Sequence, residues 1–148
     1  MADPFRVAGE IHRVLRDGGL VYAESPFMQP VHGGGHDFFR FTDRGHRRLF
    51  HRFDEVRSGV ACGPGMALSS SYRYFLRSLV HTPIGRTVTD AMGKLTSFWL
   101  AHLDEGIAEN EGSFDAASAF YFLGRRSESV VSDREIIDHY RGTWKMHA

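Results

Sequence analysis

The sequence has one cysteine, no excess of either charge and no long apolar run, and each absence excludes a class of protein. Cys62 cannot form an internal disulfide, so a reducing compartment and a role as a small buried apolar residue fit best. Eighteen basic and eighteen acidic residues cancel, which removes the simplest electrostatic argument for nucleic acid or anionic lipid. No apolar run approaches the roughly 20 residues that cross a bilayer, and the N-terminus lacks a signal-peptide pattern. We therefore expect a cytoplasmic protein with no membrane or nucleic-acid partner.

The composition is that of one ordinary globular domain. The chain has 148 residues, of which 42% are hydrophobic and 24% charged. This length buries about two-thirds of the surface that the unfolded chain exposes, so residues 1–148 are expected to form a single domain. The 12 phenylalanines predict a core in which aromatic packing dominates.

Glycine and proline divide the first part of the chain into a helix, a strand and a loop. Asp3 and Pro4 suit the cap and first position of a helix over residues 4–15, and Gly18-Gly19 ends it. The run that begins at Leu20 and ends at Glu24 is short and mostly apolar, which predicts a buried strand. Residues 27–42 contain three consecutive glycines and should form a long irregular loop, a kind of segment that is often functional.

The rest of the chain predicts an α/β fold. We expect Leu49 and Phe50 to face the core, and the same holds for the aromatic residues of the longer helices, Tyr72, Tyr74 and Phe75 among them. The later strands should pair without the helical crossover that a parallel neighbour requires. The expected elements are a helix over 43–51, a strand over 53–61, a Gly63-Pro64-Gly65 breaker, helices over 66–80 and 84–107, a turn over 110–113, a strand over 116–123 and a short helix over 132–140.

One stretch resembles a known family. The segment GEIHRVLRDGGLVYAESPF, residues 9–27, is similar to the stretch after the fourth strand of class I S-adenosylmethionine-dependent methyltransferases of the type 11 kind. Asp17 stands where that family usually has proline. Residues 26–50 resemble a subgroup with a histidine-containing loop after the fifth strand, and residues 118–126 resemble the family's terminal hairpin strand. The positions that match the first pattern are Glu10, Arg13, Val14, Leu15, Gly18 and Gly19.

The resemblance implies only part of a methyltransferase fold. It implies a partial Rossmann-like architecture of about three strands, the fifth strand plus a C-terminal antiparallel hairpin, with flanking helices. The implied cofactor is S-adenosylmethionine, which the family holds on a glycine-rich turn after its first strand. We expect no such turn here, because Gly63-Pro64-Gly65 is interpreted as a breaker and Gly33-Gly34-Gly35 opens no apolar helix. We therefore expect no cofactor-binding residues here, and a chain that is inactive alone.

The same reading predicts an unpaired strand edge. The strand from Leu20 to Glu24 would lack the neighbour that precedes it in the family, and open edges invite pairing with another chain. We expect a homodimer, or a separate N-terminal half, to bind along that edge. The alternative is a non-catalytic dimerisation or partner-binding module derived from the methyltransferase fold.

The long loop carries the candidate site residues His32, His36, Asp37 and Arg40. In methyltransferase-like proteins this loop faces the active cleft, so the four are candidates for contact with the substrate or for general-base work. Two imidazoles and a carboxylate could bind zinc or iron, but no third strong ligand lies close by, and we assign no metal. The structural alternative is that these groups fix the loop, with Arg40 paired to Asp37 and the loop phenylalanines as buried anchors.

A locally basic helix follows the loop. Its cationic groups are expected to form a solvated face, because the whole chain is neutral, with phosphate binding as the alternative. The residues concerned are Arg44, His46, Arg47, Arg48, His51 and Arg52.

Overall fold

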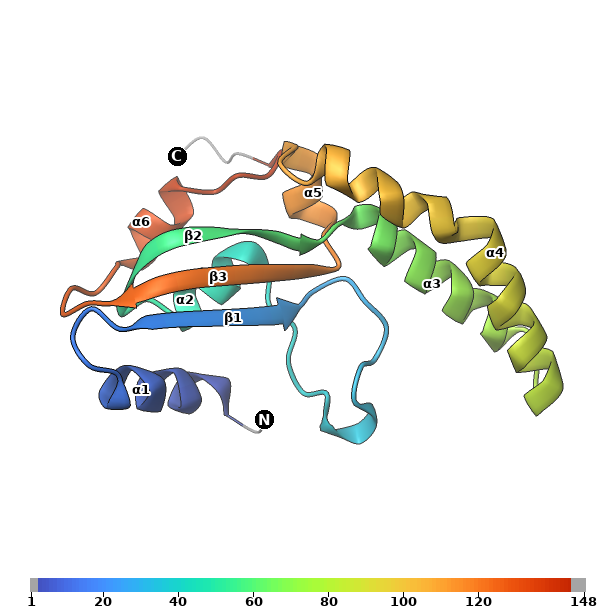
Figure 1. Ribbon diagram of the computed structural model, residues 1–148, viewed down its shortest axis with the longest axis horizontal. Coiled ribbons are helices and arrows are strands. Elements are labelled where there is room, and N and C mark those ends of the chain that lie inside the picture. The colour runs from blue at the N-terminus through green and yellow to red at the C-terminus, as the bar shows by residue number, and fades with distance from the viewer. Residues whose placement is uncertain (1–2, 145–148) are drawn as a thin grey trace.

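The computed structural model describes residues 3–144, and within them it has a three-stranded sheet with six α-helices (Figure 1). The elements, in chain order, are α1 (Pro4–Val14), β1 (Leu20–Pro26), the 3₁₀ turn η1 (Gly34–His36), α2 (Asp43–Leu49), β2 (Phe53–Cys62), α3 (Pro64–Ser78), α4 (Pro83–Ile107), α5 (Glu111–Ala116), β3 (Ala119–Arg126) and α6 (Asp133–Asp138).

The sheet is antiparallel throughout, with strand order β1-β3-β2. Leu20 lies opposite Arg125 and Pro26 opposite Ala119. Strand β1 therefore pairs along its full length with the central strand β3. The β2–β3 pair has two register irregularities. Two predictions are thus confirmed: the α/β class, and the pairing of the later strands without a parallel crossover. Helices α3 to α5 lie between β2 and β3 in the chain.

Local signals place the first helix and strand correctly. The Asp3 carboxylate accepts a hydrogen bond from the Arg6 amide at 3.0 Å, and Gly18 takes the positive φ of 69° that a turn after a helix requires. The prediction that the strand is buried holds for one face only, where Val21 and Ser25 are buried. Leu20 and Tyr22 are 53% and 60% exposed, because α1 and α2 cover one face of the sheet and no described helix covers the other (Figure 1).

The core is aromatic, as the composition predicts. One cluster joins Ala8 of α1 and Leu49 of α2 to the inner face of the sheet, where the rings of Phe50 and Phe122 stack at 5.1 Å. A second, smaller cluster consists of Phe114, Ala117 and Phe120. Phe5 and Val14, which share the apolar spacing of α1, are exposed instead.

Three boundaries differ from the sequence prediction. The expected breaker starts α3, since Pro64 takes its first helical position. The turn expected over 110–113 belongs mostly to α5 (Glu111–Ala116). Strand β3 begins at Ala119 rather than at 116, and it continues through Gly124 to Arg126, beyond the predicted end at 123. A side chain at Gly124 would meet the Phe122 ring at 2.4 Å, so that buried ring occupies the space beside the glycine.

Helices α3 and α4 form a hairpin that projects from one end of the sheet (Figure 1). The prediction that Tyr72, Tyr74 and Phe75 are core residues is wrong, because all three are exposed. The residues buried between the helices are small ones, among them Ser69 and Ser97. Small residues let the helices approach closely, and the larger side chains therefore point outward.

Candidate functional site

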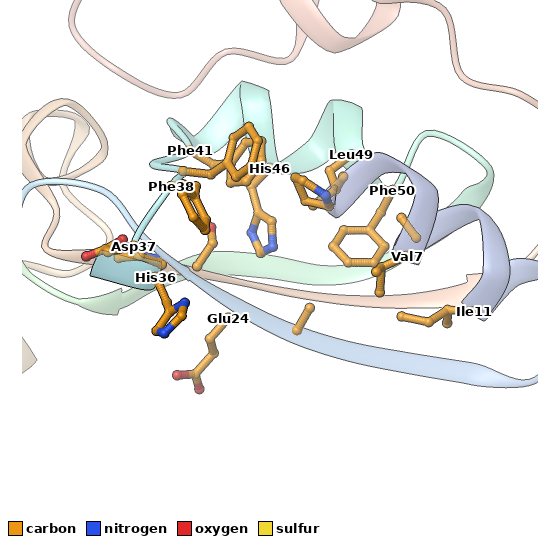
Figure 2. A pocket seen from close by; sticks show the side chains of 16 residues that line it. Val7, Ile11, Glu24, His36, Asp37, Phe38, Phe41, His46, Leu49 and Phe50 are labelled. Atoms are coloured by element: carbon orange, nitrogen blue, oxygen red, sulfur yellow. The ribbon is translucent and has the colours of Figure 1, made fainter. Parts of the chain in front are cut away.

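A pocket of about 280 Å³ lies at the carboxyl end of β1 and is lined by residues of α1, the long loop and α2 (Figure 2). Figure 2 shows Phe50 of α2 close to Val7 of α1, with Leu49 behind it and His46 nearer to Phe41 of the loop. Apart from a few polar groups, the walls are apolar. Their apolar members are Pro4, Val7, Ala8, Ile11, Ala23, Pro26, Phe38, Phe39, Phe41, Leu49 and Phe50.

Ser25 supplies a buried polar group to this apolar pocket. The residue is 8% exposed, and its hydroxyl has no hydrogen-bond partner among the described residues. Leaving a hydroxyl unpaired in an apolar environment costs about 1–3 kcal/mol. A ligand with a hydrogen-bonding group in the pocket would therefore gain an interaction that the protein alone does not make.

His46 is the second polar group of the wall, and sequence reasoning missed it. The prediction placed it on a solvated basic face, but it is 2% exposed and packs edge-on against Phe50 at 5.4 Å. Burial lowers the pKa of the imidazole from 6.5 to about 4, so the ring is neutral at pH 7. The spacing of His46, Leu49 and Phe50 at i, i+3 and i+4 is the signal that places all three on one helix face.

Asp37 and Arg40 form the internal ion pair that the sequence suggested. Both guanidinium nitrogens of Arg40 donate to the Asp37 carboxylate, and Arg40 also donates to the Pro30 carbonyl at 3.3 Å. The His32 amide donates to Asp37 at 2.6 Å. The bond from Arg40, followed by that from His32, lowers the pKa of Asp37 to about 2. Asp37 is thus a weak base that closes the loop on itself.

The phenylalanines of the loop divide into an anchor and a rim. Phe41 packs against the aromatic core, and its amide donates to the Pro26 carbonyl at 3.1 Å. Phe39 stacks on Phe41 at 6.1 Å, yet Phe38 and Phe39 are exposed and line the pocket. The prediction of a buried anchor therefore holds for Phe41 and is wrong for the other two.

The structure brings His36 and Asp37 to the pocket, whereas His32 and Arg40 are not among the residues that line it. His36 is exposed, and in Figure 2 its side chain and that of Glu24 project on the same side of β1, away from α2. Their part in substrate contact or proton transfer stays a prediction. Within residues 3–144, no group of three or more histidine, cysteine, aspartate or glutamate side chains is placed to hold a metal ion.

The arginines of α2 are mostly engaged in the fold. Arg47 was expected to be solvated but is buried, donating to the Phe50 carbonyl at 2.8 Å and the Phe53 carbonyl at 3.0 Å, and it pairs with Glu55. Arg44 pairs with Asp43, which also accepts a bond from Arg141. Of these three arginines, only Arg48 has the expected solvated position: it is exposed and pairs with Asp133. This network neutralises the charge that a phosphate site would need.

Cys62 is half-buried and forms no disulfide. Burial, followed by the neighbouring carboxylates of Glu24 and Asp104, raises the pKa of its thiol, so the thiol is protonated at neutral pH and weakly nucleophilic. The expected inert role is consistent with this position.

No family model, curated protein or solved structure matches this chain. Of the helices in the described part of the chain, none is both long and apolar enough to cross a membrane.

Proposed function

We propose that this chain is the acceptor-binding part of an S-adenosylmethionine-dependent methyltransferase fold, and that it is inactive alone. The observation that carries the proposal is the unit from α1 through β1, whose sequence resembles that family and whose strand ends in a pocket. In open α/β sheets, ligands bind beyond the carboxyl ends of the strands. The pocket at Ser25 and Pro26 occupies that position.

The pocket has the composition of a site for a small, mostly apolar acceptor. Its walls are largely hydrocarbon and aromatic, and Ser25 and neutral His46 offer two points for hydrogen bonding. Methyl transfer needs the acceptor atom in line with the methyl group, so positioning supplies much of the rate. The Asp37–Arg40 pair closes the loop whose residues line the pocket, and the exposed His36 of the same loop is the candidate base.

The residues of this chain do not fit the cofactor itself. S-adenosylmethionine would supply the methyl group, but its binding needs a glycine turn between a strand and a helix. The triple glycine leads only into the three-residue turn η1. The Gly63-Pro64-Gly65 turn does join β2 to α3, but it packs against α4, and Asp104 accepts from the Gly65 and Met66 amides. Neither turn therefore offers a free backbone cradle after a strand. A second polypeptide segment must therefore hold the cofactor.

The free edge of β1 supports a partner along that strand. In the described residues β1 pairs with β3 alone, so its other edge carries unpaired backbone groups from Leu20 to Glu24, whereas the Pro26 carbonyl accepts from the Phe41 amide. A separate N-terminal half or a second copy of this chain would satisfy them. Pairing with a cofactor-binding half would also bring the donor next to the pocket.

Co-expression tests the proposal. The DNA upstream of Met1 is searched for a segment encoding a strand, a G-x-G turn and a helix, and that segment is co-expressed with this chain. We expect the two to purify together and to bind S-adenosylmethionine at one site per complex. Lack of such a segment, or a complex without affinity for the cofactor, would contradict the proposal.

A non-catalytic binding module is the second candidate. The exposed sheet face with Leu20 and Tyr22, and the exposed apolar helices α3 and α4, favour it. It predicts that no upstream segment confers cofactor binding, and that a Ser25→Ala variant leaves every interaction of the chain unchanged.

A further inference from the structure

The α3–α4 hairpin has its polar and apolar sides reversed relative to a helix pair of a soluble core. Two acidic side chains of α4 face α3: Asp90 accepts from Arg73 at 2.8 Å, and Asp104 accepts from the amides of Gly65 and Met66 at 2.7 and 2.9 Å. At 100° per residue, the large apolar residues of α4 lie on the opposite side, away from α3. These exposed residues are Ile84, Val88, Met92, Leu95 and Trp99.

The seam between the two helices is built from small residues. A side chain at Gly65 would meet the Leu100 carbonyl oxygen at 2.1 Å, and one at Gly93 would meet the Arg73 side chain at 2.7 Å. The hydroxyls of Ser69 and Ser97 share a hydrogen bond of 2.8 Å across the seam. Close contact through small residues and hydroxyl bonds, with large apolar side chains outside, is how helices pack when their surroundings are apolar.

Helix α3 continues the apolar surface. Its exposed residues Leu68, Tyr72, Phe75 and Leu79 follow each other at intervals of four, three and four, which places them in one stripe along the helix. Leu68 and Tyr72 share a shallow groove with Thr96 and Leu100 of α4. The stripe and the outer side of α4 contain no charged residue.

The charge of the hairpin is concentrated in its distal part. Residues 73–94 contain four basic residues and one acidic residue, although the whole chain is neutral. Arg77 lies over the Tyr74 ring at 5.3 Å, and Arg86 donates to the Val80 carbonyl at 3.5 Å. This part of the molecule therefore has a positive charge next to its exposed apolar residues.

We propose that the α3–α4 hairpin binds the surface of an anionic membrane, lying in its plane with the outer side of α4 and the α3 stripe in the lipid. A basic polar side combined with Trp, Phe and Leu on the other side is the pattern of helices that bind at that boundary. The 25 residues of α4 give it a length of about 37 Å. Peripheral binding is compatible with the finding that no helix within residues 3–144 could cross a membrane.

The geometry favours lipid over a second copy of the chain. Two hairpins stacked face to face would bury the side shared by α3 and α4, where α4 presents Thr89, Thr96 and Leu100. The residues at greatest exposure, such as Leu95 at 75% and Ile84 at 79%, point away from that side and would stay in water. The apolar interior of a membrane would cover the side shared by α3 and α4 and also the outer side of α4.

Vesicle sedimentation of the full chain tests the proposal. We expect the protein to pellet with vesicles of phosphatidylcholine and phosphatidylglycerol and to bind phosphatidylcholine vesicles more weakly. Leu95→Glu should weaken binding roughly tenfold or more, because it removes a leucine that the membrane would bury. Arg77→Gln should weaken binding to the anionic vesicles roughly fivefold. Val130→Glu, at an exposed apolar residue outside both the hairpin and the β1 edge, is the matched control and should bind like the unchanged chain.

A fluorescence readout locates the contact. In a Trp144→Phe background Trp99 is the only tryptophan, and its emission should shift to the blue when anionic vesicles are added. Equal loss of binding in Leu95→Glu and Val130→Glu, or no binding by the unchanged chain, would overturn the proposal. A dimer that Leu95→Glu dissociates, without vesicle binding, would also overturn it and assign the surface to a second copy. These readouts need no cofactor, so they are independent of the proposed methyltransferase function.

Discussion

At the scale of single residues, burial decides the chemistry of α2 more than charge does. His46 and Arg47 belong to the same basic run as Arg48, yet the first two are buried and the third is exposed. The helix face sets this difference: His46 and Arg47 face the aromatic rings of Phe50 and Phe122, with Arg47 at 5.2 Å from the latter. Neutral His46 is therefore part of the pocket wall.

Titration of His46 should couple stability to pH. Its pKa is 6.5 when solvated and about 4 in the fold, so the unfolded chain takes up a proton that the folded chain refuses. The contribution of neutral His46 to the free energy of unfolding is therefore fully present above pH 6.5. It falls by up to about 3 kcal/mol as the pH decreases toward 4. Urea unfolding between pH 7 and 4 measures this slope. His46→Leu should flatten it relative to exposed His102→Gln, and equal slopes in the two variants would refute the assignment.

The Asp37–Arg40 pair should control the order of the pocket loop. Asp37→Asn weakens the bonds to Arg40 and to the His32 amide, so we expect faster hydrogen exchange at His32 and faster proteolysis within residues 27–42. The difference should disappear as the pH falls through about 2, where Asp37 of the unchanged chain is itself protonated. Unaltered exchange in the variant would mean that the pair does not hold the loop.

At the scale of elements, glycine positions separate close packing from open surface. Gly65→Ala would force a methyl group against the Leu100 carbonyl, whereas at Gly106 of α4 there is open space. We expect the first change to destabilise the fold by about 1–3 kcal/mol. The second should stabilise it by about 0.5–1 kcal/mol, since alanine favours helix. Thermal unfolding of both variants measures the contrast, and a harmless Gly65→Ala would contradict the close packing of α3 on α4.

Local chemistry explains which elements the sequence predicts correctly. Asp3, Pro4 and Gly18 act within a few residues of their own positions, so the limits of α1 and the start of β1 follow from the sequence. The place of Gly124 inside β3 depends on the Phe122 ring, and the exposure of Tyr72 depends on the small residues of the facing helix. Both are tertiary effects that a pattern along one segment does not contain. The pocket was only half predicted for the same reason: the loop was recognised, but His46 and Ser25 were not.

At the scale of the whole molecule, two surfaces lack a partner among the described residues: the β1 edge and the α3–α4 hairpin. The edge predicts self-association at tens of micromolar when no other half is present. Tyr22→Lys places a charge beside that edge and should shift sedimentation toward monomer, because charged side chains oppose edge pairing. Leu123→Lys, on the central strand of the same face, is the control. A monomeric unchanged chain at this concentration would contradict the prediction.

The central claim is that this chain forms the acceptor side of a methyl-transfer site and has no place of its own for the methyl donor. Calorimetric titration of S-adenosylmethionine into the purified chain tests it most directly. The account predicts no saturable heat, because Gly33, Gly34 and Gly35 lie on an open loop. The glycine turn that does join a strand to a helix, Gly63-Pro64-Gly65 between β2 and α3, packs against α4, and Asp104 accepts from the Gly65 and Met66 amides. Saturable binding of one cofactor molecule per chain would contradict it.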